Sequence, residues 1–115
     1  MSLDVSIDRD GARVTLILAG ELDAYTASDF LSTVDAVMPT PARLMLDFGA
    51  VTLIDSAGIA ALLKVSRRTL ERPTILRIRP EIRRIFAITE LDREIDVQDS
   101  DLPNGEPTPR EIARP

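Results

Sequence analysis

The stretch Leu53-Ile54-Asp55-Ser56-Ala57-Gly58-Ile59-Ala60-Ala61-Leu62-Leu63-Lys64 decides the fold of this chain. Its first residues continue an apolar run that begins at Leu44 and is typical of a strand inside a sheet. From Ile59 to Leu70 apolar residues recur at helical spacing, and basic side chains take the other face. The stretch therefore predicts a buried strand, a tight acidic turn and an amphipathic helix that begins near Ser56.

A serine at the beginning of a helix has two interpretations. The first backbone N–H groups of a helix lack intrahelical partners, and the positive end of the helix dipole lies beside them. Ser56 is then either a helix cap, with Asp55 holding the turn, or a hydroxyl that is presented for modification. The local pattern favours neither interpretation over the other.

The composition limits the chain to one domain and argues against enzyme chemistry. The chain has 115 residues, of which 44% are hydrophobic and 3% aromatic, so its core must be aliphatic. It contains no histidine and no cysteine, which removes Ser-His-Asp catalysis, cysteine nucleophiles and the usual zinc ligands. A Ser56–Lys64 pair would span about 12 Å along a helix, too far for a hydrogen bond. We expect no enzyme activity, no cofactor and no metal.

The charges and the hydropathy pattern bear on partners and location. A formal net charge of −5 argues against nucleic-acid binding. A local basic patch of Arg77, Arg79, Arg83 and Arg84 is interpreted as a solvated face, with partner docking as the second interpretation. No apolar run is long enough for a membrane span, and the first residues lack a signal-peptide pattern. We therefore expect a cytoplasmic protein without direct membrane insertion.

The remaining patterns predict an α/β fold. Alternation from residue 3 to 7, the Asp10-Gly11 turn signal and an apolar run over 13–19 predict an antiparallel hairpin, followed by a turn over 20–23. The other expected elements are a helix over 26–37, a strand over 43–47, a loop over 48–52, the central helix to residue 70 or 71, a strand over 74–78, a helix from Pro80 and a strand over 94–97.

This ββαβαβα(β) order predicts a mixed, mostly parallel sheet of four to five strands. The N-terminal hairpin lies at one edge of the sheet, and three to four helices pack on it. We expect residues 1–98 to form the domain. Residues 99–115 are acidic and rich in proline, and we expect them to be a disordered C-terminal tail.

Three segments resemble the STAS domain of bacterial anti-sigma factor antagonists. They read GELDAYTA over 20–27, LDF over 46–48 and IDSAGI over 54–59. The later segments RPEIRRIF over 79–86 and TEL over 89–91 resemble the third helix of the same family. The resemblance covers residues 3–97 and implies the STAS fold for the whole predicted domain.

What the resemblance implies is partner switching. In that family, the serine after the aspartate is phosphorylated by an anti-sigma factor that is also a serine kinase of the histidine-kinase-like ATPase fold. The unphosphorylated antagonist binds this kinase and frees the sigma factor, and a PP2C-type phosphatase resets it. By position, the resemblance implies phosphorylation at Ser56. It places the partner-binding surface at Asp23, Asp55, Ser56, Ala57, Gly58 and Lys64.

Some of these positions have a plainer interpretation, and other functions stay open. Asp23 is also suited to hold its turn, and Gly58 to allow close packing. Many family members have a second hydroxyl where this chain has Ala57. STAS domains also serve as cytoplasmic subunits of ABC-type lipid transporters and as stressosome-like scaffold components. The family default is a monomer or weak dimer.

Overall fold

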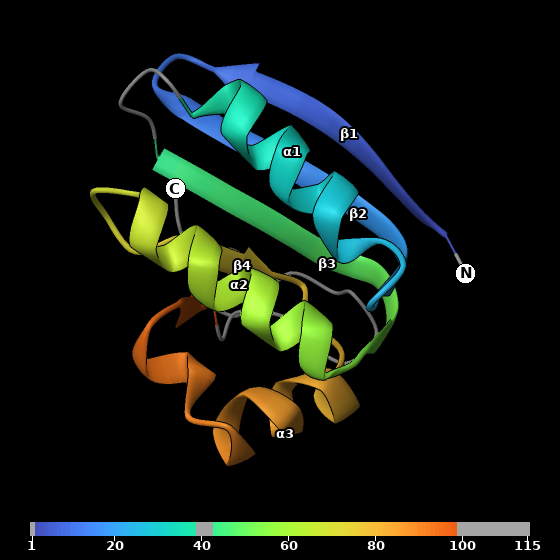
Figure 1. Cartoon of the computed structure of the whole chain (residues 1–115). Coiled ribbons are helices and arrows are strands. Elements are labelled where there is room, and N and C mark those ends of the chain that lie inside the picture. Colours follow the sequence, from blue (N-terminus) through green and yellow to red (C-terminus); the bar gives the residue numbers. More distant parts are fainter. Residues whose placement is uncertain (1, 39–42, 99–115) are drawn as a thin grey trace, which may run out of the picture.

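A five-stranded sheet forms the framework of the molecule, and its strands lie side by side in sequence order (Figure 1). The computed structural model describes residues 2–38 and 43–98. The strands are β1 (Leu3–Asp10), β2 (Arg13–Leu22), β3 (Arg43–Ile54), β4 (Thr74–Leu76) and β5 (Asp96–Val97). β1 pairs antiparallel with β2, and every later pair is parallel. The predicted mixed sheet with an antiparallel hairpin at one edge is confirmed.

Helices cover the face of the sheet toward which the aliphatic side chains point. They are α1 (Ala27–Val37), α2 (Ser56–Arg68) and α3 (Pro80–Ile88), followed by the short 3-10 helix η1 (Leu91–Arg93). α1 and α2 contact each other and cross in front of the sheet, and α3 lies toward the β4 side (Figure 1). Pro80 is the first residue of α3, as its fixed φ predicts.

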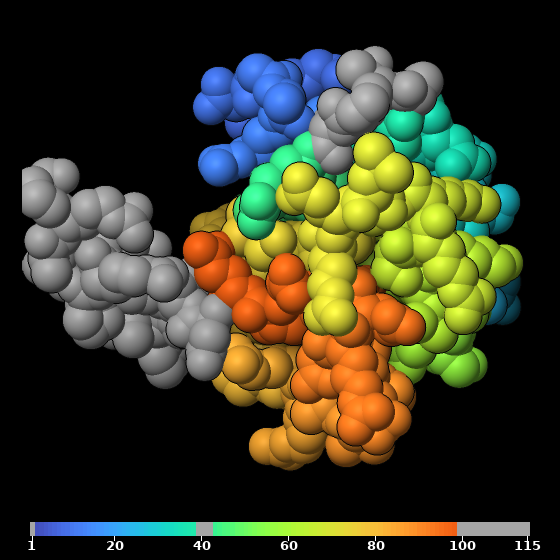
Figure 2. All heavy atoms as spheres, turned by 90° about the vertical axis from the view of Figure 1, so that its left-hand side faces the viewer, coloured from blue at the N-terminus to red at the C-terminus, as the bar shows by residue number. Residues whose placement is uncertain are grey.

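One aliphatic core lies between the sheet and the helices. Its members include Leu16, Leu46, Val34, Leu62 and Ile82, all at most 2% exposed. Figure 2 shows β1 and α3 at opposite ends of the described part, so this single core joins the two ends. Phe48 and Phe86 meet edge to face with ring centroids 6.1 Å apart, which anchors α3 to β3.

β3 is longer than the sequence pattern predicts. The expected strand over 43–47 and loop over 48–52 are a single strand that continues to Ile54. In its register with β2, Ile17 faces Asp47 but Ala19 faces Ala50, so β3 carries an extra residue there. A second extra residue follows, at Thr52, before Leu53. These β-bulges break the period-two alternation, which is why the loop prediction was wrong.

Other boundaries differ by a few residues. β2 continues to Leu22 through the predicted turn, because the ladder with β3 continues there. α2 ends at Arg68, since Thr69 is already extended. β4 ends at Leu76 because Arg77 has a left-handed backbone (φ 56°). α1 begins at Ala27, and β5 is limited to two residues. The predicted tail over 99–115 lies outside the described residues.

Candidate functional site

Two turns meet at one edge of the sheet, where β2 and β3 both end. Parallel neighbours end on the same side, and Leu22 pairs with Ile54 in the last row of the ladder. The backbone N–H of Asp55 then donates to the carbonyl oxygen of Leu22 at 3.3 Å. The segment after β2 and the segment that begins α2 are therefore adjacent.

The carboxylate of Asp55 both caps α2 and joins the two turns. Its Oδ1 accepts from the N–H of Gly58 at 3.0 Å, which satisfies one of the free donors at the helix N-terminus. Its Oδ2 accepts from the N–H of Ala24 at 3.3 Å, in the turn after β2. One side chain thus fixes the distance between two segments that lie 31 residues apart in the sequence.

Ser56 is the first residue of α2, and its side chain is exposed. Within residues 2–38 and 43–98, its hydroxyl makes no hydrogen bond, and Asp55 supplies the cap instead. The interpretation of Ser56 as the helix cap was therefore wrong. The hydroxyl of Ser66, later in the same helix, differs from that of Ser56, because it donates to the carbonyl of Leu63 at 2.7 Å. Ser56 presents a hydroxyl that the fold itself does not use.

Asp23 holds the turn between β2 and α1. It is 4% exposed, and its Oδ1 accepts from the N–H groups of Tyr25 (2.9 Å) and Thr26 (3.1 Å). The Thr26 hydroxyl donates to the carbonyl of Glu21 at 2.7 Å and accepts from the N–H of Asp23 at 3.0 Å. The carboxylate points into the turn, so the structure gives Asp23 a turn-forming role, and its partner contact stays a prediction.

Gly58 allows α2 to begin close to β2. A Cβ at this position would lie 2.4 Å from the carbonyl oxygen of Leu22 and 2.8 Å from Cγ1 of Ile54. Real Cβ atoms do not come so close to a backbone oxygen, so only glycine fits without a shift of the helix. Gly58 is buried, so it acts on the site through packing, and its predicted partner contact is untested.

The surface beside Ser56 continues along α2. Ala57 and Lys64 line a groove of about 460 Å³ between α1 and α2, and small side chains such as Ala24 and Ala60 form much of its wall. Lys64 is exposed and lies about two turns of α2 beyond Ser56. The structure therefore places Ala57 and Lys64 on one continuous surface with Ser56.

Sequence reasoning missed three members of this edge. Ala24 contributes the N–H that binds Asp55, and nothing in its residue type indicates this. Tyr25 is 78% exposed and Leu53 is 42% exposed, each within three residues of Asp23 or Ser56. An exposed aromatic in a turn was the available signal, because large apolar side chains at a surface often mark a contact site.

Among residues 2–38 and 43–98, no three His, Cys, Asp or Glu side chains lie together as metal ligands. In the same residues, none of the helices has the length and apolar character of a membrane span.

The family follows from comparison with known proteins. The model of a family described as "Mlab, STAS domain" matches residues 5–99, so this chain belongs to the STAS domain family. Comparison with curated proteins gave no match.

Solved structures share the fold over most of the chain. An anti-sigma factor antagonist from Mycobacterium paratuberculosis is 22% identical with a TM-score of 0.77, covering 85% of this chain and 86% of that chain. The unphosphorylated anti-sigma factor antagonist SpoIIAA is 19% identical with a TM-score of 0.65, covering 84% and 88%. The Bacillus cell fate determinant SpoIIAA in its phosphorylated form is 19% identical with a TM-score of 0.64, covering 83% and 91%. At these identities the likeness shows the fold.

Proposed function

We propose that this protein is an anti-sigma factor antagonist that acts by partner switching, with Ser56 as the phosphorylated residue. The observation that carries the proposal is the exposed Ser56 hydroxyl, which makes no hydrogen bond within the described residues while Asp55 caps the helix. The fold shared with anti-sigma factor antagonists supports the same class. SpoIIAA has been solved in both phosphorylated and unphosphorylated forms, so this fold tolerates the modification in that protein.

The proposed partner is an anti-sigma factor that is also a serine kinase of the histidine-kinase-like ATPase fold. In the phosphorylation step, the Ser56 Oγ–P bond forms as the bond from the γ-phosphorus to the bridging oxygen of ATP breaks. ADP leaves, and the serine proton passes to a base of the kinase. A PP2C-type phosphatase hydrolyses the phosphoserine and restores the hydroxyl. The chain itself needs no catalytic group in either step.

The local geometry explains how one phosphate releases the partner without unfolding α2. The N–H groups of Ser56 and Ala57 lie in the first turn of α2, where backbone donors and the helix dipole favour an anion. The phosphate adds about −1.5 to −2 charges beside the Asp55 carboxylate. A partner seated over Ser56 then has to bury like charges together, and we expect its affinity to fall at least about 100-fold, or 2.7 kcal/mol.

The unmodified surface suits a protein partner. Tyr25 and Leu53 expose apolar area in the two segments that Asp55 joins, and Ala57 adds only a methyl group to the first turn of α2. Interface centres are rich in aromatic and aliphatic side chains and poor in charge, so a partner that covers Ser56 gains contact area there. Asp23 and Gly58 shape the two turns, and their contact with the partner remains part of the proposal, together with that of Lys64.

Phosphorylation in a cell extract tests the proposal. The purified chain, Ser56→Ala and Ser66→Ala are incubated with ATP and an extract of the source cells, and intact mass and peptide mapping locate any phosphate. We expect one phosphate on the wild type and on Ser66→Ala, and none on Ser56→Ala. If the wild type stays unmodified while a control substrate is phosphorylated, partner switching at Ser56 is rejected.

Capture of the unmodified chain's partner separates the proposal from its main alternative. Recovery of a kinase-class anti-sigma factor that Ser56→Asp fails to recover supports partner switching. Recovery of the ATPase of an ABC-type transporter, equally with wild type and Ser56→Asp, would instead favour a transporter subunit. Light scattering on the same samples tests the expected monomer or weak dimer.

A further inference from the structure

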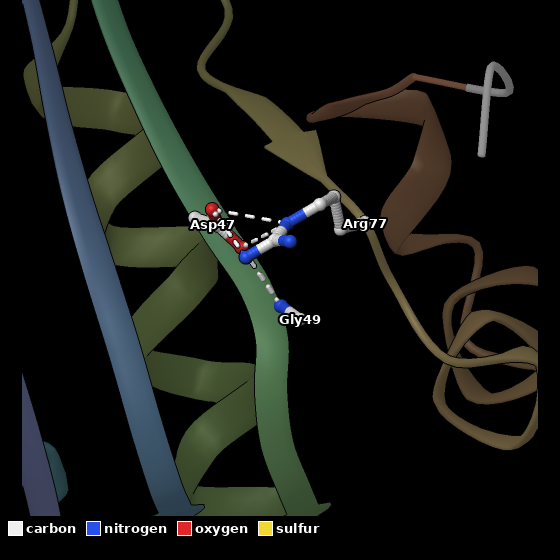
Figure 3. A network of polar contacts seen from close by, with 3 residues as sticks. All are labelled: Asp47, Gly49 and Arg77. Carbon is white, nitrogen blue, oxygen red and sulfur yellow. Dashed lines mark hydrogen bonds and ion pairs between the residues drawn. The ribbon is translucent and has the colours of Figure 1, made fainter. Parts of the chain in front are cut away.

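A second polar network lies on β3, on the sheet face opposite α1 and α2 (Figure 3). Leu46 and Phe48 are buried under the helices, so Asp47 between them points to the other face. Its Oδ1 and Oδ2 accept from Nε of Arg77 at 3.1 and 3.2 Å, and Nη2 of Arg77 lies 3.1 Å from Oδ2. Arg77 directly follows β4, so the pair links β3 to the chain that leads into α3.

The same carboxylate holds the first bulge of β3. Asp47 Oδ1 accepts from the N–H of Gly49 at 2.9 Å, inside the segment where β3 has an extra residue relative to β2. The guanidinium lies over Gly49, since a Cβ there would come within 2.9 to 3.0 Å of its atoms. Arg77 reaches this position from a left-handed backbone with φ 56°, which is costly for a residue with a side chain. The Asp47 carboxylate, the Gly49 backbone and the Arg77 guanidinium thus all contact one another at the first bulge.

The bulge decides which side chains of the following residues face the core. Buried positions run Leu46, Phe48, then Val51 and Ile54, so the spacing changes from two to three after Phe48, at the first bulge, and is three again across the second bulge at Thr52. Ile54 then pairs with Leu22 and packs against Gly58, directly before Asp55. Without the extra residue, the face of every later residue in β3 would be reversed. The orientation with which the chain enters the Ser56 turn therefore depends on the bulge.

We propose that Asp47 and Arg77 are positioning residues for the Ser56 turn, because their ion pair holds the bulge that orients the end of β3. The inference rests on the proposed function for its biological meaning. Its primary readout is the backbone of the turn, which is measured without any kinase. The pair also ties that turn to the connection between β4 and α3, a part of the chain that does not itself border Ser56.

Amide hydrogen exchange on the full chain tests the proposal. In Asp47→Asn, we expect the amides of Gly49, Ala24 and Gly58 to exchange about tenfold faster. Arg77→Lys should give a smaller increase, because an ammonium keeps the positive charge beside Asp47 but cannot form the planar two-point contact. Glu71→Gln is the matched control. It removes the ion pair of 3.5 Å between Arg43 and Glu71 at the other end of β3, and we expect no change at Ala24 or Gly58.

The pattern of exchange decides the result. Faster exchange at Gly49 alone would mean that the network acts only locally, and an equal increase at all core amides would mean a loss of global stability. Either outcome overturns the positioning role. If Ser56 is phosphorylated in the wild type, Asp47→Asn should lower kcat/KM for phosphorylation about tenfold at unchanged Tm. If the wild type is not phosphorylated, the proposed function fails, while the exchange pattern still decides this inference.

Discussion

At the scale of single residues, the site depends on a close approach of two backbones more than on any one charge. Gly58 and the carbonyl of Leu22 are in contact, and Asp55 joins the same two segments through its two carboxylate oxygens. Ser56 contributes no bond to this arrangement within the described residues. The residue proposed for modification and the residues that hold its position are therefore different, and each can be changed separately.

Gly58→Ala should destabilise the protein by about 2–3 kcal/mol, because the new methyl group forces α2 away from β2. Gly11→Ala is the matched control. Gly11 has φ 63° but no neighbour within 4 Å of an added Cβ, so only backbone strain of about 1 kcal/mol is expected. Urea unfolding followed by circular dichroism measures both. If both variants lost the same free energy of unfolding, the contact between Gly58 and Leu22 would not be the cause of the destabilisation.

At the scale of elements, α3 is attached to the rest of the molecule through one aromatic contact and a short apolar stripe. Ile82 and Phe86 are its buried residues, and Phe86 meets Phe48 of β3. Arg84 on the same helix is exposed. Of the four arginines in the predicted basic patch, Arg79 and Arg84 are exposed, whereas Arg77 pairs with Asp47 and Arg83 is half-buried, so the solvated-face interpretation describes only part of the patch.

Phe86→Ala should cost about 3–5 kcal/mol, since it removes a buried ring and leaves a cavity beside Phe48. Arg84→Ala, on the exposed side of α3, should change the free energy of unfolding by less than about 0.5 kcal/mol. Thermal unfolding monitored at 222 nm, a general helix signal, compares the two variants with the wild type. A small loss in Phe86→Ala would mean that α3 contributes little to the stability of the core.

The elements differ in how far the sequence determines them. Strand and helix order, the hairpin and the start of α2 could be predicted, because alternation, turn residues and helical spacing are local signals. The second half of β3 could not, since its bulges exist only in relation to β2. For the candidate site, Ser56 and Asp55 could be identified by pattern. The bond from Ala24 to Asp55 could not, because it joins residues 31 positions apart.

At the scale of the whole molecule, every helix packs its buried residues into the same hydrophobic core. Buried residues of β2, β3, β4, α1, α2 and α3 belong to a single hydrophobic cluster, and partly buried residues of β1 and β5 pack against it. A chain organised in this way has no subdivision that could unfold alone while the remainder keeps its core. Surface ion pairs such as Arg68–Asp35, at 2.8 Å, add little to the free energy of unfolding because both partners are exposed.

The domain should therefore unfold in one cooperative transition. Circular dichroism and NMR peak intensities of Val34, in α1, and Ile82, in α3, should give the same urea midpoint within error. The two residues lie on different helices of the same core, so they serve as independent probes. Midpoints that differ between them would show that α3 and η1 form a separate unit of lower stability.

The sequential order of the strands has a consequence for synthesis on the ribosome. Each strand lies beside the strand made just before it, so no segment has to wait for a distant partner. The two turns of the Ser56 site come from residues 22 to 58 and are complete once α2 has emerged. Arg77 emerges later and adds the ion pair to Asp47 last. The residues of the proposed switch are therefore synthesised before Arg77, and the shared core that holds them is completed only when α3 has emerged.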